Sequence, residues 1–222
     1  MGSNWEDLDN SSWNRFNNSG AYNRPPVVMV TGFAPFNGNN QNASWEAVQR
    51  INKESLEDKY GVEIMQVMFP VKYKSIDNNI RDLWTTHRPK LMIHTGVSEE
   101  IESIRLETTA YREGYEIEDV DGETCANNCY PSEGPDSIKT GINVEEIVNK
   151  INKNYTSQFD AEISENAGRY LCEYIYYSSL RINKHATLFV HVPDTNVYSE
   201  ELSAYGLQTI IEMCIKQIGI AE

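Results

Sequence analysis

The stretch Val27-Val-Met-Val-Thr31-Gly-Phe-Ala-Pro-Phe36 decides the fold class of this chain. Its first five residues are apolar or β-branched, and a loop rich in Gly and Pro follows at once. A short apolar run that ends in turn residues is typical of a buried strand. Similar runs alternate with amphipathic stretches over the rest of the chain, which is the pattern of a sheet covered by helices on both faces. We therefore predict an α/β protein, a three-layer α/β/α sandwich around an open, mostly parallel, twisted sheet.

This alternation also predicts the individual elements. We expect strands over residues 27–31, 62–69, 91–95, 103–109, 160–163 and 187–192, and helices over 44–54, 72–87, 144–152, 167–182 and 200–218. Ligands of such sheets bind beyond the carboxyl ends of the strands. The loop after the first strand and the end of the last strand are therefore expected at one edge of the sheet.

Cys172 and His191 are the candidates for chemistry. Cys172 opens an aromatic helical stretch in Asn166-Ala-Gly-Arg-Tyr-Leu-Cys172, and His191 ends an apolar strand in Thr187-Leu-Phe-Val-His191-Val-Pro193. A thiol near a helix N-terminus is partly ionised by the helix dipole and by any imidazolium beside it, so it can act as a nucleophile near neutral pH. The simpler alternative is a structural cysteine, because free Cys usually behaves as a small hydrophobe. The pair suggests a cysteine hydrolase.

Several segments, in the same order along the chain, resemble one family. The stretch from Val27 to Gly38, a strand followed by a loop, and the Asn42-Ala-Ser44 after it are similar to a Thr-Gly-Phe-x-Pro-Phe-Gly-Gly loop and an Asn-x-Ser motif. His94-Thr-Gly96-Val-Ser98 and Ile104-Arg-Leu-Glu107-Thr-Thr-Ala110 are similar to a strand, loop and glutamate region, and the Cys172 and His191 segments resemble a cysteine and a histidine motif. The family is pyroglutamyl-peptidase I, also called pyrrolidone-carboxylate peptidase. The sequence Glu133-Gly-Pro-Asp-Ser137 looks most like that of the animal form.

The resemblance implies a function and a set of site residues. It implies a cysteine exopeptidase that removes an N-terminal L-pyroglutamyl residue from peptides through a pyroglutamyl thioester. Cys172 would be the nucleophile, His191 the general base and Glu107 the carboxylate that orients the imidazole. Phe33 and Phe36 would sandwich the flat, neutral lactam ring of the substrate.

Other interpretations stay open for the residues taken singly. Asn42 is implied by the resemblance to shape or polarise the pocket, but by default it is a helix cap. Phe33 and Phe36 are by default core residues, because a buried Phe removes a large apolar area from water. Glu107 alone would be a solvated strand carboxylate. His94 follows an apolar strand and is the rival base, with a structural role expected.

Two other functions are compatible with the chain. One is a catalytically weak relative that binds peptides or partners, and the other is a different cysteine hydrolase such as a deamidase, with an altered pocket. Departures from the family pattern bear on both: Asn37 replaces a glycine, Val97 replaces a common Gln, and Tyr111-Arg112 stands where bacterial members carry an Asn. These departures put substrate preference and rate in question, and leave the triad in place.

Composition narrows the class of protein. A chain of 222 residues with 40% apolar content can bury one sizeable core, so we expect a single catalytic domain over 27–222. A net charge of −14 argues against nucleic acid and anionic membranes as partners. Four cysteines and a polar, acidic N-terminus without a secretory signal favour the cytosol. We expect no cofactor and no metal, because Cys125 and Cys129 lack a second ligand pair.

Two segments depart from the α/β pattern. Residues 1–26 are rich in Asn and Ser and poor in aliphatics, which predicts a disordered polar extension. Residues 112–137 lack clear periodicity and contain acids, Gly, Pro and two Cys. A long excursion with a β-arm and a disordered segment are both compatible with that composition.

Overall fold

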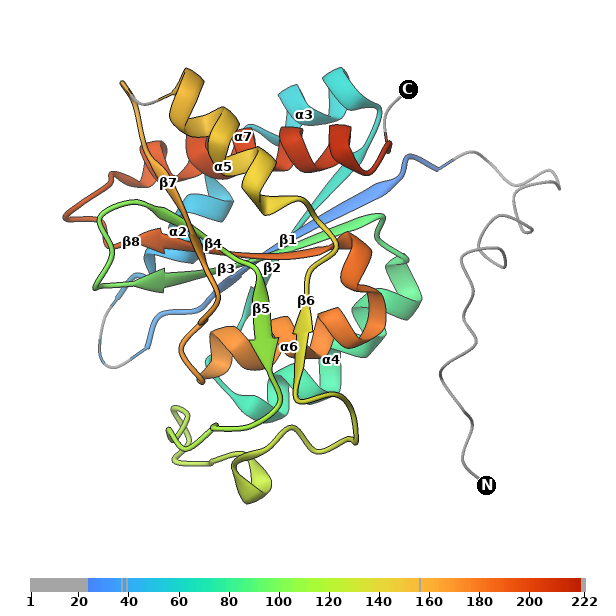
Figure 1. Ribbon diagram of the computed structural model, residues 1–222, viewed down its shortest axis with the longest axis vertical. Coiled ribbons are helices and arrows are strands. Elements are labelled where there is room, and N and C mark those ends of the chain that lie inside the picture. Colours follow the sequence, from blue (N-terminus) through green and yellow to red (C-terminus); the bar gives the residue numbers. More distant parts are fainter. Residues whose placement is uncertain (1–23, 37, 39, 156, 221–222) are drawn as a thin grey trace, which may run out of the picture.

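The fold is built on a six-stranded sheet, described in a computed structural model for residues 24–36, 38, 40–155 and 157–220. The strand order is β2-β1-β3-β8-β4-β7 (Figure 1). The bounds are β1 Val27–Phe33, β2 Glu63–Phe69, β3 Leu91–Ser98, β4 Ile104–Glu107, β7 Ala161–Ser164 and β8 Thr187–Pro193. The first four strands of that order are parallel, and β4 is antiparallel to β8 but parallel to β7. The predicted mostly parallel α/β sheet is confirmed.

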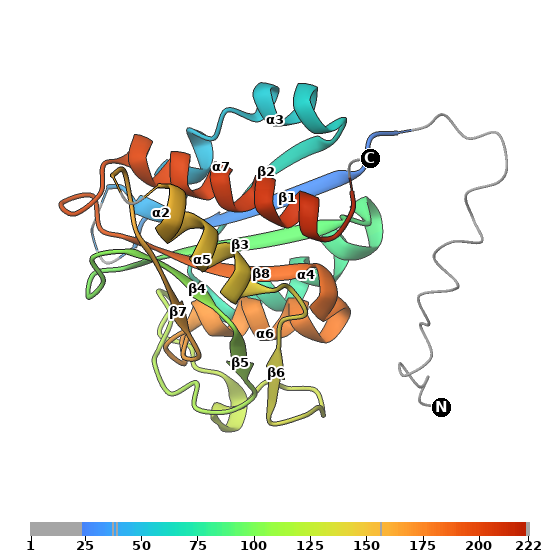
Figure 2. The ribbon, with the colours of Figure 1, turned by 45° about the horizontal axis from the view of Figure 1, so that its top comes forward.

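Helices cover both faces of this sheet, as Figures 1 and 2 show. One face carries α2 (Ala43–Gln49), α3 (Lys53–Tyr60), α5 (Val144–Asn154) and α7 (Glu200–Gln217), and the other carries α4 (Tyr73–His87) and α6 (Leu171–Asn183). Strand residues alternate between the two apolar cores: Val28 and Val30 pack with the first group of helices, and Met29 packs with the second. This alternation follows from the two-residue period of a strand.

Two predicted helices differ from the structure by more than two residues at one end. The predicted helix 44–54 is two helices. The first ends at Gln49, and Asn52 starts the second as the N-cap of α3, since its side chain accepts a hydrogen bond from the Ser55 amide, 3.0 Å away. The predicted helix 167–182 begins four residues later, at Leu171. Gly168 and Arg169 have left-handed φ angles of 96° and 54°, which a helix cannot contain.

The segment after β4 forms an excursion with its own small sheet. The predicted strand 103–109 breaks at Thr108, and β5 (Thr109–Tyr111) pairs antiparallel with β6 (Ser137–Lys139) beside α6 (Figure 2). Between them lies a 3₁₀ turn at Ala126–Asn128, and a second one, Lys184–Ala186, precedes β8. Tyr115 of the excursion is fully buried, with its ring 5.1 Å from that of Tyr174 on α6. The paired strands thus lie at the base of the segment 112–137, and within it the antiparallel pairing continues only as the isolated bridge between Glu113 and Cys129.

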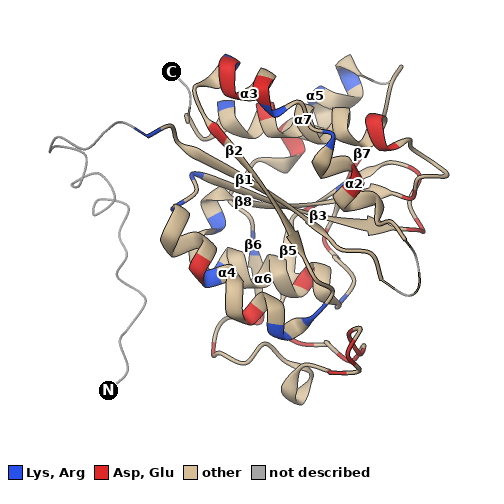
Figure 3. Ribbon diagram, turned by 180° about the vertical axis from the view of Figure 1, so that it is seen from behind, with Lys and Arg blue, Asp and Glu red and all other residues tan. Residues whose placement is uncertain are grey.

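Charged residues lie mainly on the helices and loops, and the central strands are almost free of them within the described part of the chain (Figure 3). The arrangement keeps ionised groups in water and apolar strand residues between the helix layers. The proposed extension 1–26 falls almost wholly outside the described residues.

Candidate active site

The carboxyl ends of β1, β3 and β8 meet at one edge of the sheet, because these strands are parallel and adjacent. Phe33 ends β1 and His191 lies near the end of β8. Cys172 is the second residue of α6, which packs on β3 and β8. The expectation that the Phe33 loop and His191 share one edge is confirmed, and α6 brings Cys172 to the same region.

His191 is held by Glu107 across the sheet. His191 Nδ1 lies 2.9 Å from Glu107 Oε1, and the two side chains are 8% and 0% exposed. Glu107 comes from β4, the strand that pairs antiparallel with β8. A carboxylate at Nδ1 selects the tautomer that protonates this nitrogen and leaves Nε2 free to accept a proton. The solvated carboxylate considered for Glu107 is therefore wrong, since the side chain is buried against the imidazole.

Gly96 brings the thiol and the imidazole together. It is the register partner of His191 in the β3–β8 ladder. A Cβ atom at Gly96 would lie 2.6 Å from Cys172 Sγ and 3.4 Å from His191 Cδ2, the ring carbon bonded to Nε2. Both side chains therefore pack against the bare backbone of this glycine. Gly96 is the site residue that our sequence prediction missed, and a glycine inside an apolar strand was its signal.

The ionisation of Cys172 differs from the sequence-based expectation. Burial raises the pKa of the Cys172 thiol to about 12, and the negative charge of Glu107 acts in the same direction. The direction of this shift is opposite to the one that we expected from the helix dipole. A raised pKa favours removal of the thiol proton by a base during the attack over a thiolate formed beforehand.

The aromatic loop after β1 is anchored by Asn42. Its Oδ1 accepts hydrogen bonds from the amide and the hydroxyl of Ser44, and its Nδ2 donates to the Ala34 carbonyl at 3.2 Å. Asn42 is therefore the N-cap of α2, as its default interpretation has it, and it also holds the loop that carries Phe33 and Phe36. Phe33 is buried, whereas Phe36 is half-buried against the same apolar cluster that Cys172 contacts.

His94 has a structural role, as expected. It is fully buried, with Nδ1 2.8 Å from Thr31 Oγ1 and Nε2 2.7 Å from Ser179 Oγ, so both ring nitrogens are engaged. Burial lowers the pKa of His94 from 6.5 to about 3. The imidazole is therefore neutral in the folded protein and is no rival base.

The lowered pKa of His94 predicts a loss of stability in acid. Between pH 6.5 and the folded-state pKa, the unfolded chain binds a proton at His94 that the folded chain does not. The contribution of neutral His94 to the free energy of unfolding should thus be fully present above pH 6.5. It should fall by up to about 3 kcal/mol on acidification to pH 4. We expect chemical denaturation to show a smaller pH slope for His94→Gln than for the wild type, with exposed His185→Gln as the control. Equal slopes for all three proteins would contradict the assignment.

Cys125 and Cys129 contact each other within the excursion. Cys125 Sγ donates to the Cys129 carbonyl at 2.7 Å, and both are free thiols. Among the residues that the structure describes, no three His, Cys, Asp or Glu side chains group closely enough to hold a metal ion. Within the same residues, no helix has the length and apolar content needed to cross a membrane.

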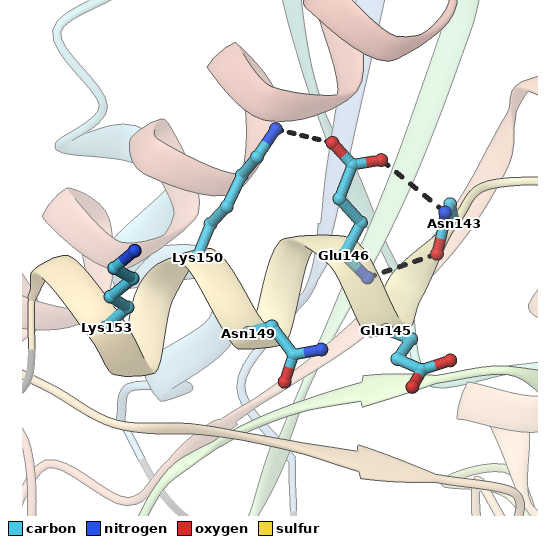
Figure 4. A pocket seen from close by; sticks show the side chains of 6 residues that line it. All are labelled: Asn143, Glu145, Glu146, Asn149, Lys150 and Lys153. Carbon is cyan, nitrogen blue, oxygen red and sulfur yellow. Dashed lines mark hydrogen bonds and ion pairs between the residues drawn. The ribbon is translucent and has the colours of Figure 1, made fainter.

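A shallow hollow on α5 is a surface feature of that helix. It is lined by Asn143, Glu145, Glu146, Asn149, Lys150 and Lys153 (Figure 4). Glu146 pairs with Lys150, and its backbone amide donates to the capping side chain of Asn143. These groups satisfy one another, and α5 lies on the face of the sheet opposite α6.

Comparison with known proteins identifies the family of this chain. The sequence profile of the family described as Pyroglutamyl peptidase matches residues 27–213. The chain is 34% identical to mouse Pyroglutamyl-peptidase 1 over 199 residues, 88% of this chain and 91% of the mouse protein. It is also 34% identical to the human protein of that name over 189 residues, 84% of this chain and 88% of the human one.

Solved structures agree in fold. A mutant pyrrolidone carboxyl peptidase from Pyrococcus furiosus superposes with a TM-score of 0.75 at 21% identity, over 86% of this chain and 99% of that one. The pyroglutamyl peptidase I of Bacillus amyloliquefaciens gives a TM-score of 0.72 at 24% identity, over 87% and 97%. With the sequence match extending across β1, β3, β4, α6 and β8, which carry the candidate site, the chain belongs to the pyroglutamyl peptidase family.

Proposed function

We propose that this protein is a cysteine exopeptidase that hydrolyses the N-terminal L-pyroglutamyl residue from peptides. The observation that carries the proposal is the packing of Cys172 Sγ and the His191 ring against Gly96, with the buried Glu107 carboxylate on the other side of the imidazole. Nucleophile, base and orienting acid in this order form a cysteine-hydrolase triad. Membership of the pyroglutamyl peptidase family supplies the substrate class.

The reaction follows from the states of these groups. His191 Nε2 accepts the thiol proton as Cys172 Sγ attacks the acyl carbon of the pyroglutamyl residue. The bond to the next residue's nitrogen then breaks, and the imidazolium passes its proton to the leaving amine. Water, deprotonated by His191, attacks the thioester, and the C–S bond breaks to release pyroglutamate and return the thiol. The raised pKa of Cys172 favours proton removal during the attack rather than before it.

Glu107 serves both halves of this cycle. Its Oε1 fixes the imidazole through Nδ1, and its negative charge stabilises the imidazolium that forms in each transfer. Oε2 is buried without a hydrogen-bond partner among the described residues. The contact of Oε1 with His191 therefore has to offset the cost of burying this carboxylate.

Amides at the start of α6 are suited to bind the oxyanion. Tyr170, the N-cap residue, makes no side-chain hydrogen bond to the helix among the contacts that the structure describes. The first N–H groups of a helix have no partner within the helix, and they point along the positive end of its dipole. A tetrahedral oxyanion formed at Cys172 could accept from these groups.

For the pocket, we assign Phe33 and Phe36 to the two faces of the lactam. The half-buried state of Phe36, its packing on the cluster that Cys172 contacts and the anchoring of its loop by Asn42 all support this assignment. A slot between phenyl faces suits a flat, neutral ring and disfavours the charged glutamyl residue, because the charges would lose their water. We assign the cytosol as the place of action, supported by four cysteines that are all free thiols within the described residues.

A comparison of hydrolysis rates on three related amides tests the proposed function. Purified protein in reducing buffer should release the fluorophore from a pyroglutamyl amide, with kcat/KM roughly 10³-fold above that for the matched glutamyl amide. A prolyl amide, which keeps the ring and carries a charged amine in place of the lactam, is the second control. Equal rates on the three amides, or hydrolysis of internal amides alone, would replace this proposal with a different cysteine hydrolase.

Gly96→Ala tests the contact between thiol and imidazole. The new methyl group would meet Cys172 Sγ at 2.6 Å and Phe189 Cζ at 3.0 Å, so the sulfur must move away from its position. We expect kcat/KM to fall by roughly 10²-fold, because misplacement by about 1 Å has an effect of this size. Gly206→Ala, whose methyl group would meet Ile104 Cδ1 on the other face of the sheet, controls for overpacking. Wild-type activity in folded Gly96→Ala would contradict the geometry.

A further inference from the structure

Glu173, the residue after the proposed nucleophile, is a fully buried carboxylate with four hydrogen bonds. Its Oε2 accepts from the Arg169 backbone amide at 2.8 Å, and its Oε1 accepts from the Tyr111 amide at 3.0 Å. The Arg169 guanidinium Nη1 donates to both oxygens, at 2.8 and 2.6 Å. No carboxylate of this kind is needed for the proposed bond-breaking steps, so the contacts call for a separate account.

The hydrogen bond from the Arg169 amide to Glu173 shapes the start of the helix that carries Cys172. Glu173 is the third residue of α6, and its carboxylate reaches back to the amide of Arg169, which lies before the N-cap Tyr170. This is close to the backward half of a capping box, in which an acid at the third helical position binds a main-chain amide ahead of the helix. The cap is thus made from inside the helix, and it does not occupy the amides of Leu171 and Cys172.

Arg169 is itself held in an unusual backbone conformation. Its φ is 54° and that of the preceding Gly168 is 96°, so two consecutive left-handed residues turn the chain into the helix. A left-handed φ costs a side-chain-bearing residue about 1 kcal/mol or more, and it persists where surrounding contacts enforce it. The amide and guanidinium contacts of Arg169 with Glu173 are those contacts.

The remaining contacts tie this turn to the excursion. Tyr111 ends β5, where the excursion begins, and its ring lies 3.9 Å from the Arg169 guanidinium in a cation–π contact. A Cβ at Gly114 would lie 3.0 Å from Arg169 Cδ, so the excursion packs closely on the arginine stem. Strand β5 lies beside α6 in Figures 1 and 2.

We propose that Glu173 is a positioning residue, whose buried carboxylate joins Arg169 and Tyr111 and thereby fixes the Cys172 end of α6 against His191. The inference rests on the proposed function for its kinetic test, but not for its chemical test. A purely stabilising ion pair is the alternative, and it predicts a lower melting temperature with an unchanged rate per folded molecule. A positioning role predicts a change in the reactivity of Cys172 in protein that is still folded.

Glu173→Gln is the decisive variant, because it keeps the shape and one oxygen acceptor but removes the charge that Arg169 balances. Glu146→Gln is the matched control, since Glu146 also forms an i,i+4 pair, with Lys150, and lies on the opposite face of the sheet. For Glu173→Gln we expect kcat on a pyroglutamyl amide to fall by roughly 10- to 100-fold with little change in KM, measured at a temperature where both variants are fully folded. Wild-type kcat in folded Glu173→Gln would overturn the proposal.

Alkylation of Cys172 by iodoacetamide, followed by mass spectrometry of its peptide, gives the readout that needs no turnover. We expect the pH–rate profile at Cys172 to shift in Glu173→Gln and to match the wild type in Glu146→Gln, and unchanged profiles in both would overturn the positioning role. If Glu173→Gln does not fold, Arg169→Lys keeps the charge and the main-chain amide but not the planar fork, and the same two measurements apply. An inactive wild type with a shifted alkylation profile in the variant would reject the proposed function and retain the positioning role.

Discussion

Cys172→Ala is expected to abolish hydrolysis of a pyroglutamyl amide, with kcat/KM reduced by at least about 10⁴-fold. Without the sulfur no thioester can form, and His191 and Glu107 have no thiol proton to take. The fold should survive, because the change removes one atom from a half-buried side chain at the edge of an apolar cluster. Release of fluorophore, followed alongside far-UV circular dichroism and thermal melting, measures both expectations.

Cys129→Ala is the matched control for this variant. Cys129 is half-buried like Cys172, is a free thiol and lies in the excursion, so its loss should leave turnover within about twofold of the wild type. Cys172→Ser adds a second comparison, since a hydroxyl keeps the hydrogen bonding and is a far weaker nucleophile. Turnover by Cys172→Ala at the wild-type rate would remove Cys172 from the mechanism and leave His191 acting on water.

Glu107→Gln is expected to lower kcat by 10³- to 10⁴-fold, on the order seen when a triad carboxylate is replaced by its amide. The amide cannot balance the imidazolium that forms in each step, and its NH₂ group can favour the tautomer with Nε2 protonated, which cannot accept the thiol proton. KM should change little, because Glu107 is buried behind His191 and is not assigned to the pocket. Steady-state kinetics across pH 6 to 9 measure the changes in kcat and KM separately.

Glu162→Gln provides the control for removing a carboxylate from this part of the sheet. Glu162 is the register partner of Arg105 in the β4–β7 ladder and pairs with it at 2.7 Å, half-exposed to solvent. A surface pair of this kind contributes about 0–1 kcal/mol to stability, so activity should stay close to the wild type. Similar losses of kcat in Glu107→Gln and Glu162→Gln would contradict the role of the Glu107–His191 contact. They would mean that both changes act by disturbing this edge of the sheet.

Local sequence patterns were sufficient for most of the fold. The apolar runs at 27–31, 91–95 and 187–192 became β1, β3 and β8 because a strand flanked by helix layers must be apolar on both faces. The errors arose where local backbone geometry intervened. The two left-handed residues Gly168 and Arg169 delayed the start of α6, and the Asn52 cap divided the helix predicted over 44–54.

The site could be predicted only in part. Cys172, His191 and Glu107 were named from motifs that resemble the family, and the structure places Glu107 against His191 and the Cys172 sulfur against Gly96 beside that ring. Glu173 had no visible role in the sequence, because its partner Tyr111 lies 62 residues earlier in the chain and the burial of the carboxylate depends on that contact. The interpretation of Asn42 as a cap was correct because capping depends on neighbours only two residues away.

The sequence by itself determined which segments become strands and helices, since periodicity, caps and turn residues act over a few positions. Only the tertiary structure decided the pKa shifts of the titratable side chains on those strands and helices. The helix N-terminus favoured an ionised Cys172, yet burial raises its pKa to about 12, and burial lowers that of His94 to about 3. Desolvation depends on everything packed around a group, and those neighbours come from strands and helices far apart in the chain.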